Sequence, residues 1–140
     1  MAKRMGADVV VEPHDAVAKI MALTGGKGVD IAVEALGKQV TFENACAVTR
    51  LGGTVSSVGV YAGIESLSLP LGGSFIHRKL VTTFCPSGTD RLTRLMAMIG
   101  GGKVDLRPLI THSMKLSETV EGYNLFRDRK GGVLKIALRP

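Results

Sequence analysis

The chain has 140 residues, of which 45% are hydrophobic and 21% charged, so it can bury a globular core and is neither disordered nor fibrous. The formal net charge is +6, but the basic residues are scattered and aromatic residues are few, which argues against a nucleic-acid partner. No apolar run reaches the roughly 18 residues of a membrane-spanning helix, so we expect a soluble, cytoplasmic protein with no membrane association.

The first elements predicted along the chain are a helix end, a strand and a helix. Residues 1–6 are typical of the end of a helix that Gly6 closes in a left-handed conformation, and the apolar residues 8–12 predict a strand. Asp15 is a plausible N-cap for the next helix. Apolar residues recur in it every three or four positions until a glycine pair that begins at Gly25 ends it.

The next stretch predicts a β-α-β unit. A strand at residues 30–35 leads into a helix at residues 38–50, and after a glycine pair a second strand covers residues 54–58. Val, Ile and Ala occupy both faces of the strands, which indicates a parallel sheet covered on both sides. Four residues share the helix face that would pack on this sheet: Phe42, Ala45, Cys46 and Thr49.

Ligands of parallel sheets lie beyond the carboxyl ends of the strands, so residues 35–37 and 58–60 are the first place to look for a function. At Gly59 a strand runs into a loop. One interpretation is that this glycine lets a flat ring approach the backbone, whose N–H and C=O groups can recognise a carboxamide. The other is a simple strand-ending turn, which the tripeptide alone favours.

The middle of the chain predicts a loop, a strand and a helix. Residues 61–77 show no period and predict a long loop with a short extended piece near residues 67–71. A strand follows from Leu80 to Phe84. The next helix has apolar residues at spacings of three and four, a possible N-cap in Asp90, and three glycines at its end.

The last segment differs in character from the rest. It predicts a strand at residues 109–115, a helix capped by Ser117 and a final strand at residues 133–138. We therefore divide the chain into residues 1–108 and residues 109–140, which could belong to another lobe.

The sequence carries no motif of a catalytic or metal site. The G-x-G-x-x-G loop of dinucleotide-binding domains is absent, and the GGKG stretch at residues 25–28 follows a helix, which is the wrong place for a phosphate loop. Cys46 and Cys85 form no C-x-x-C motif, and we interpret both as packing residues. Three histidines show no metal-ligand spacing: His14, His77 and His112.

Five stretches, in the same order, resemble the C-terminal portion of the medium-chain, zinc-containing alcohol dehydrogenases: AKRMGAD, TGGKGVDIAVEALG, RLGGTVSSVGVYAG, RKLVTTFCPSGTDRLTRLM and KVDLRPLITHSMKLSETVEGY. Within that family the chain is most similar to the bacterial NADP-dependent secondary alcohol dehydrogenases. The resemblance implies an α/β fold. Residues 1–108 would be a Rossmann-type parallel sheet without its first strands, and residues 109–140 would return to the catalytic lobe.

The resemblance places nine residues against the cofactor, NADP or NAD: Ala35, Leu36, Val58, Gly59, Val60, Thr83, Phe84, Cys85 and Lys135. The first two would lie beside a ribose, and the next three would lie along the nicotinamide. The three that follow would offer backbone groups to its carboxamide, and the lysine would meet the pyrophosphate. The alternative for the lysine is a solvated surface residue.

Two features of the family are missing from this chain. The family uses zinc to polarise an alcohol or ketone while a nicotinamide cofactor transfers the hydride, but neither the zinc ligands nor the glycine loop is present. We therefore expect a part of such an enzyme that is inactive by itself. The alternatives are a non-catalytic module that self-associates or binds a partner protein, and a module that keeps weak nucleotide affinity.

The missing strands would also leave a gap in the sheet. In the family's strand order they separate residues 8–12 from residues 30–35. We expect either that these two segments pair directly in a four-stranded sheet or that a second chain fills the gap. The strand at residues 80–84 could also pair across a homo-oligomer, as the corresponding strands of the family do.

Overall fold

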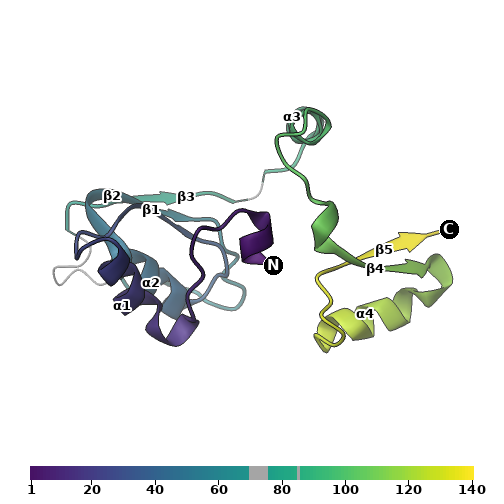
Figure 1. The fold of residues 1–140 in the computed structure, drawn as a ribbon, viewed down its shortest axis with the longest axis horizontal. Helices are drawn as coiled ribbons and strands as arrows, with labels where there is room; N and C mark the ends of the chain where they lie inside the picture. Colours follow the sequence, from purple (N-terminus) through teal and green to yellow (C-terminus); the bar gives the residue numbers. More distant parts are fainter. Residues whose placement is uncertain (70–75, 85) are drawn as a thin grey trace. The chain divides into compact units, whose positions relative to one another are not determined.

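The computed structural model describes residues 1–69, 76–84 and 86–140, and the chain forms two compact units, Met1–Pro86 and Ser87–Pro140 (Figure 1). None of the helices in the described residues is long and apolar enough to cross a membrane. Each unit is built around parallel strands joined by a helix, which confirms the predicted α/β class.

The first unit contains a parallel three-stranded sheet. Its strands are β1 (Val29–Glu34), β2 (Thr49–Ser57) and β3 (Lys79–Thr82), in that order across the sheet. The helix α2 (Gln39–Val48) connects the first two strands. The predicted β-α-β unit and the predicted strand from Leu80 to Phe84 are therefore confirmed, although the elements begin and end at somewhat different residues.

The largest shift is at the start of β2, which begins at Thr49 with no loop after α2. The sequence predicts that helix to reach Arg50 and to stop at the following glycines. In the structure Arg50 lies in the strand, where its Nε donates to the Asp30 carboxylate at 2.5 Å. The glycine pair sits in an irregularity of the β1–β2 register rather than in a break, and a Cβ on Gly53 would lie 2.8 Å from the Asp30 carbonyl oxygen.

The core lies between the sheet and α2. Four side chains are buried together there: Phe42, Ala45, Cys46 and Val55. The predicted helix face is thus confirmed for Phe42, Ala45 and Cys46, whereas Thr49 is buried but belongs to β2 and not to the helix. The packing role of Cys46 is also confirmed, and burial raises its pKa. Figure 1 shows α1 (Ala16–Leu23) and α2 on the same face of the sheet.

Within the first unit, no described helix lies on the opposite face of the sheet, so this unit by itself does not provide the predicted cover on both sides (Figure 1). Side chains alternate along a strand, and the β1 residues that face away from α2 are Ile31 and Val33, each 63% exposed. Although its apolar residues suggest burial on both faces, β1 is therefore exposed on one face within this unit.

Residues 8–12 form no strand, and the predicted four-stranded sheet is wrong for the described part of the chain. Val9 and Val10 are both more than half exposed. A strand needs hydrogen bonds from a neighbouring strand, and local sequence cannot supply that partner. The helix end before this segment is confirmed, because the 3-10 helix Ala2–Met5 is closed by Gly6 at a φ of 100°.

The predicted loop at residues 61–77 has no helix or strand in its described part. It is tied to α2 by Gln39, whose side-chain amide makes two hydrogen bonds with the backbone of Ser68, at 2.9 and 3.0 Å. The predicted extended piece falls partly outside the described residues, and its residues 67–69 form no strand.

The second unit contains a helix followed by a strand-helix-strand motif. The helix is α3 (Thr89–Gly100), and the motif is β4 (Ile110–Lys115), α4 (Thr119–Arg127) and β5 (Lys135–Arg139). The strands β4 and β5 pair in parallel, so the predicted motif is confirmed.

Three predicted N-caps are not confirmed as side-chain caps. Asp15 precedes α1, but its carboxylate pairs with Lys19 Nζ at 2.6 Å instead of capping the backbone. Asp90 lies inside the first turn of α3. Ser117 lies in a 3-10 turn before α4, where Glu118 accepts the Lys115 N–H at 2.7 Å.

We predict that Phe42→Ala will unfold or strongly destabilise the first unit. The ring is fully buried in a core of few residues, and such truncations cost about 3–5 kcal/mol. Chemical denaturation of both proteins measures the loss. Val40→Ala is the matched control on the same helix, because Val40 is 56% exposed and should change stability by less than about 1 kcal/mol. Equal losses in the two variants would contradict this description of the core.

Candidate functional site

The carboxyl ends of β1, β2 and β3 lie along one edge of the sheet, because all three strands run in parallel. We call residues 35–37, 58–60 and 83–84, which follow these strands, the carboxyl edge. It brings together seven of the nine residues predicted to contact a cofactor: Ala35, Leu36, Val58, Gly59, Val60, Thr83 and Phe84. Cys85 lies outside the described residues, and Lys135 lies in the second unit.

The first two loops of the carboxyl edge pack directly on each other through two glycines. Gly37 has a φ of 82°, and a Cβ there would overlap the backbone of Val60. A Cβ on Gly59 would overlap both the backbone nitrogen of Gly37 and a carboxylate oxygen of Glu34. The close approach of the two loops therefore requires glycine at both positions.

A buried carboxylate holds the first loop in place. Glu34, the last residue of β1, is 3% exposed. Its Oε1 accepts the backbone N–H groups of Leu36 and Gly37, both at 2.8 Å, and the hydroxyl of Thr41 at 2.7 Å. Its Oε2 accepts the hydroxyl of Tyr61 at 2.7 Å. These four donors satisfy a charge that would otherwise be costly to bury.

The same residue also holds the second loop. The main-chain oxygen of Glu34 accepts the N–H of Val58 at 2.8 Å and that of Gly59 at 3.1 Å. The Tyr61 hydroxyl that reaches the carboxylate lies 2.7 Å from Ser57 Oγ. Glu34 is therefore the common anchor of both loops.

The hydrogen bonds determine the ionisation of this cluster. Burial alone would raise the pKa of Glu34, but the bonds from Thr41, Tyr61, Gly37 and Leu36 together lower it below its ordinary value of 4.5. Burial raises the pKa of Tyr61, and the neighbouring Glu34 carboxylate raises it further against the opposing bond from Ser57. At neutral pH the pair is thus an ionised acceptor and a neutral donor.

These contacts change the interpretation of Gly59. Its N–H and that of Val58 are already bonded to Glu34, and the glycine is explained by its packing on Gly37. What the carboxyl edge exposes is mainly apolar: Leu36, Val58, Val60 and Phe84. Such a surface suits the flat, uncharged part of a ligand better than a phosphate group.

Glu34 is the residue that the sequence analysis missed. A signal was available, because it is the one charged residue in the apolar end of its predicted strand, directly before the loop. Burial of that carboxylate depends on Thr41 and on Tyr61, which lie seven and 27 positions further along the chain.

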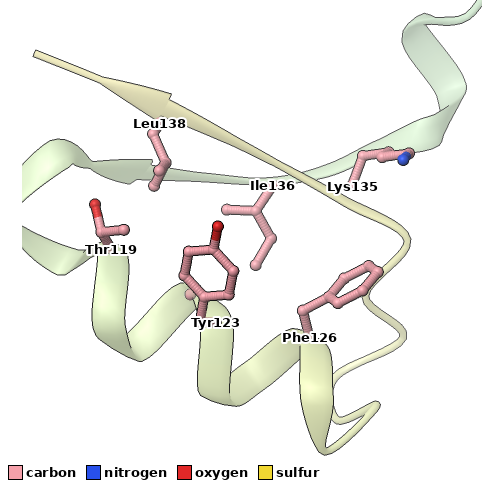
Figure 2. Close-up of a pocket in the computed structure, with 7 residues that line it drawn as sticks. Thr119, Tyr123, Phe126, Lys135, Ile136 and Leu138 are labelled. Atoms are coloured by element: carbon pink, nitrogen blue, oxygen red, sulfur yellow. The ribbon is translucent and has the colours of Figure 1, made fainter.

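Lys135 lies at the start of β5, on the rim of an apolar groove of about 230 Å³ in the second unit. Figure 2 shows the rings of Tyr123 and Phe126 rising from α4 toward the strand, with the Lys135 amine at one end. The groove is lined by seven residues: Thr119, Gly122, Tyr123, Phe126, Lys135, Ile136 and Leu138. An exposed amine beside aromatic rings could meet an anionic group of a ligand.

Known proteins share this sequence and fold. Residues 1–101 match the family model described as zinc-binding dehydrogenase. The chain belongs to the zinc-binding dehydrogenase family. An alcohol dehydrogenase of Cupriavidus necator is 45% identical over 145 residues, which cover 100% of this chain and 39% of the relative. The NADP-dependent isopropanol dehydrogenase of Thermoanaerobacter brockii is 31% identical, with 96% of this chain and 40% of the relative covered.

A solved structure shares this fold as well. The alcohol dehydrogenase TADH from Thermus sp. ATN1 superposes with a TM-score of 0.82 at 27% identity, covering 99% of this chain and 40% of that one. The predicted Rossmann-type fold and the resemblance to alcohol dehydrogenases are therefore confirmed. The chain spans about 40% of the length of the relatives it matches.

The described residues do not fit the zinc site of a zinc-binding dehydrogenase. Zinc sites need three or four His, Cys, Asp or Glu ligands, and no three such side chains gather in the part of the chain that the structure describes. We therefore assign no metal-binding role to any of the described residues.

We predict that Gly37→Ala will destabilise the first unit far more than Gly63→Ala. Both glycines have left-handed φ values, 82° and 76°, which cost alanine about 1–2 kcal/mol. Only at Gly37 would the new methyl group also overlap backbone, since nothing lies within 4 Å of Gly63. Urea denaturation should give a difference of at least about 2 kcal/mol between the variants. A difference near zero would contradict the close contact of the loops.

We predict that Glu34→Gln will lower the free energy of unfolding by about 1–3 kcal/mol at neutral pH. Because folding lowers the pKa of Glu34, the unfolded chain binds that proton more readily. The stabilisation by the carboxylate is therefore fully present above pH 4.5 and is lost as the pH falls through the folded pKa. Urea titrations at several pH values measure the difference between the two proteins, which should shrink in acid.

The control for this prediction is Glu43→Gln, since Glu43 is an exposed residue of α2 that bonds only to Gln39 among the described side chains. It should change stability by less than about 0.5 kcal/mol at any pH. A wild-type advantage over Glu34→Gln that stays constant into acid would argue against an ionised, hydrogen-bonded Glu34.

Proposed function

We propose that this chain supplies part of the cofactor-binding domain of a zinc-dependent alcohol dehydrogenase, an enzyme that transfers a hydride between an alcohol or ketone and NADP or NAD. The observation that carries the proposal is the carboxyl edge, where two loops are held ready by Glu34 at the position at which parallel sheets bind ligands. Family membership and the matching folds support it.

The exposed residues of the carboxyl edge have the chemistry that the flat half of a nicotinamide cofactor needs. Ala35 and Leu36 would lie beside a ribose, and Val58, Gly59 and Val60 would cover the nicotinamide ring. Thr83, Phe84 and Cys85 would offer backbone groups to its carboxamide. The bound cofactor would supply or accept the hydride, and these residues would orient its ring and keep water from one face.

The end of the chain would contribute to the enzyme in a different way. We infer that residues 1–108 belong to the cofactor-binding domain and that residues 109–140 return to the catalytic lobe. Lys135, with its exposed amine, would approach the cofactor pyrophosphate. By itself the chain should not oxidise alcohols, because its sequence offers no glycine loop for the pyrophosphate.

Self-association is a further part of the proposal. The strand β3 is at one edge of the sheet, and Leu80 and Val81 are exposed on it, so two copies could pair along this strand. A purely protein-binding module is the weaker alternative, because none of the comparisons supports it.

We predict weak, saturable binding of NADPH or NADH, with a Kd no better than about 1 mM because the glycine loop is absent. Calorimetric titration of the purified chain measures it. Lys135→Ala should weaken binding about five-fold, the loss of one exposed charge-assisted contact. Lys103→Ala is the matched control, because Lys103 is an exposed lysine of the same unit outside the groove.

The titration separates the cofactor affinity of the carboxyl edge from the role of Lys135. A folded chain that binds neither nucleotide would mean that the carboxyl edge has no cofactor affinity by itself. Equal binding by Lys135→Ala and wild type would show that Lys135 is a solvated surface residue. The mass measured in the same buffer tests the pairing of β3, which a species of 14.8 kDa would contradict.

A further inference from the structure

Side-chain hydrogen bonds hold the loop at residues 58–60 at both ends, and both involve the Tyr61 hydroxyl, which is bonded to Glu34. At its start, Ser57 ends β2 and its Oγ lies 2.7 Å from the Tyr61 hydroxyl. At its end, Tyr61 donates that hydroxyl to Glu34 Oε2 at 2.7 Å. The loop is thus closed by a side-chain contact between residues four positions apart.

The closure fixes the residues that a ligand would meet. Between the fastened ends, Val58 and Val60 expose their side chains, while the N–H groups of Val58 and Gly59 point back to the Glu34 main chain. The backbone of the loop therefore faces the protein and its apolar side chains face outward. An unfastened loop would have to be ordered when a ligand binds, and that ordering weakens affinity.

We propose that Glu34 and Tyr61 are positioning residues for the nucleotide, which hold the carboxyl edge in its binding geometry before the ligand arrives. The proposal rests on the proposed function of this edge as a nicotinamide-cofactor site. Neither residue needs to touch the cofactor. Glu34 acts through Leu36 and Gly37 on one loop, and through Tyr61 on the other.

Tyr61→Phe is the informative variant. It keeps the ring and removes only the hydroxyl, while Glu34 retains its bonds from Thr41, Leu36 and Gly37, so the fold should survive. Truncation of Glu34 to alanine would leave several buried donors without an acceptor and would disturb the fold itself. The matched control is Thr93→Val, which also removes one hydroxyl, because Thr93 is exposed on α3 and lies outside both the carboxyl edge and the groove beside Lys135.

Two measurements on the ¹⁵N-labelled chain test the proposal. Amide hydrogen exchange should be about ten-fold faster at Val58 and Gly59 in Tyr61→Phe and unchanged at Val55 in the core strand. Chemical-shift titration with NADP⁺ and NAD⁺ should give a Kd about five-fold weaker for Tyr61→Phe. Thr93→Val should match wild type in both experiments.

The outcomes separate this proposal from the proposed function. Unchanged exchange at Val58 and Gly59 would overturn the positioning role whether or not the chain binds nucleotide. Faster exchange with unchanged affinity would overturn it as well. Faster exchange at Val55 would show a general loss of structure and count against it. If wild type shows no nucleotide-induced shifts, the proposed function fails first, and the positioning role falls with it.

Discussion

The structure of the carboxyl edge follows from the cost of burying one charge. The Glu34 carboxylate is almost completely removed from water, and an ionised group in that position requires hydrogen-bond donors on both oxygens. The donors come from its own loop, from Thr41 on α2 and from Tyr61 beyond β2. Satisfying this charge therefore also sets the path of the chain after two strands. The arrangement of the candidate site is a consequence of that requirement.

As a result, backbone N–H groups of the carboxyl edge hold the loops in place, and its side chains form the exposed surface. The N–H groups of Leu36, Gly37, Val58 and Gly59 are bonded to Glu34, and apolar side chains are left to face outward. A zinc-binding dehydrogenase must hold a charged cofactor as well as its ring, so the groups that hold the charge must come from elsewhere. In the proposed function, Lys135 would meet that charge.

Local patterns in the sequence were sufficient to predict the β-α-β unit, the helix α3 and the edge at which the site lies, because apolar period and glycine position are local properties. They failed where the outcome depends on a distant partner. The valines of residues 8–12 have no neighbouring strand with which to pair. The glycines before Thr54 predict the end of a helix, but in the structure they lie within β2. Glu34 was missed because its burial depends on Tyr61, 27 positions further along.

The contact between Gly37 and Gly59 means that substitutions at these two positions constrain each other during evolution. A side chain at either one would meet the backbone or carboxylate of the other loop, so neither can change while its partner loop stays in place. A lineage that acquired a larger residue at one site would have to rebuild the opposite loop as well. Among related sequences the pair should thus vary together, and a substitution at one position would indicate a remodelled carboxyl edge rather than an isolated change.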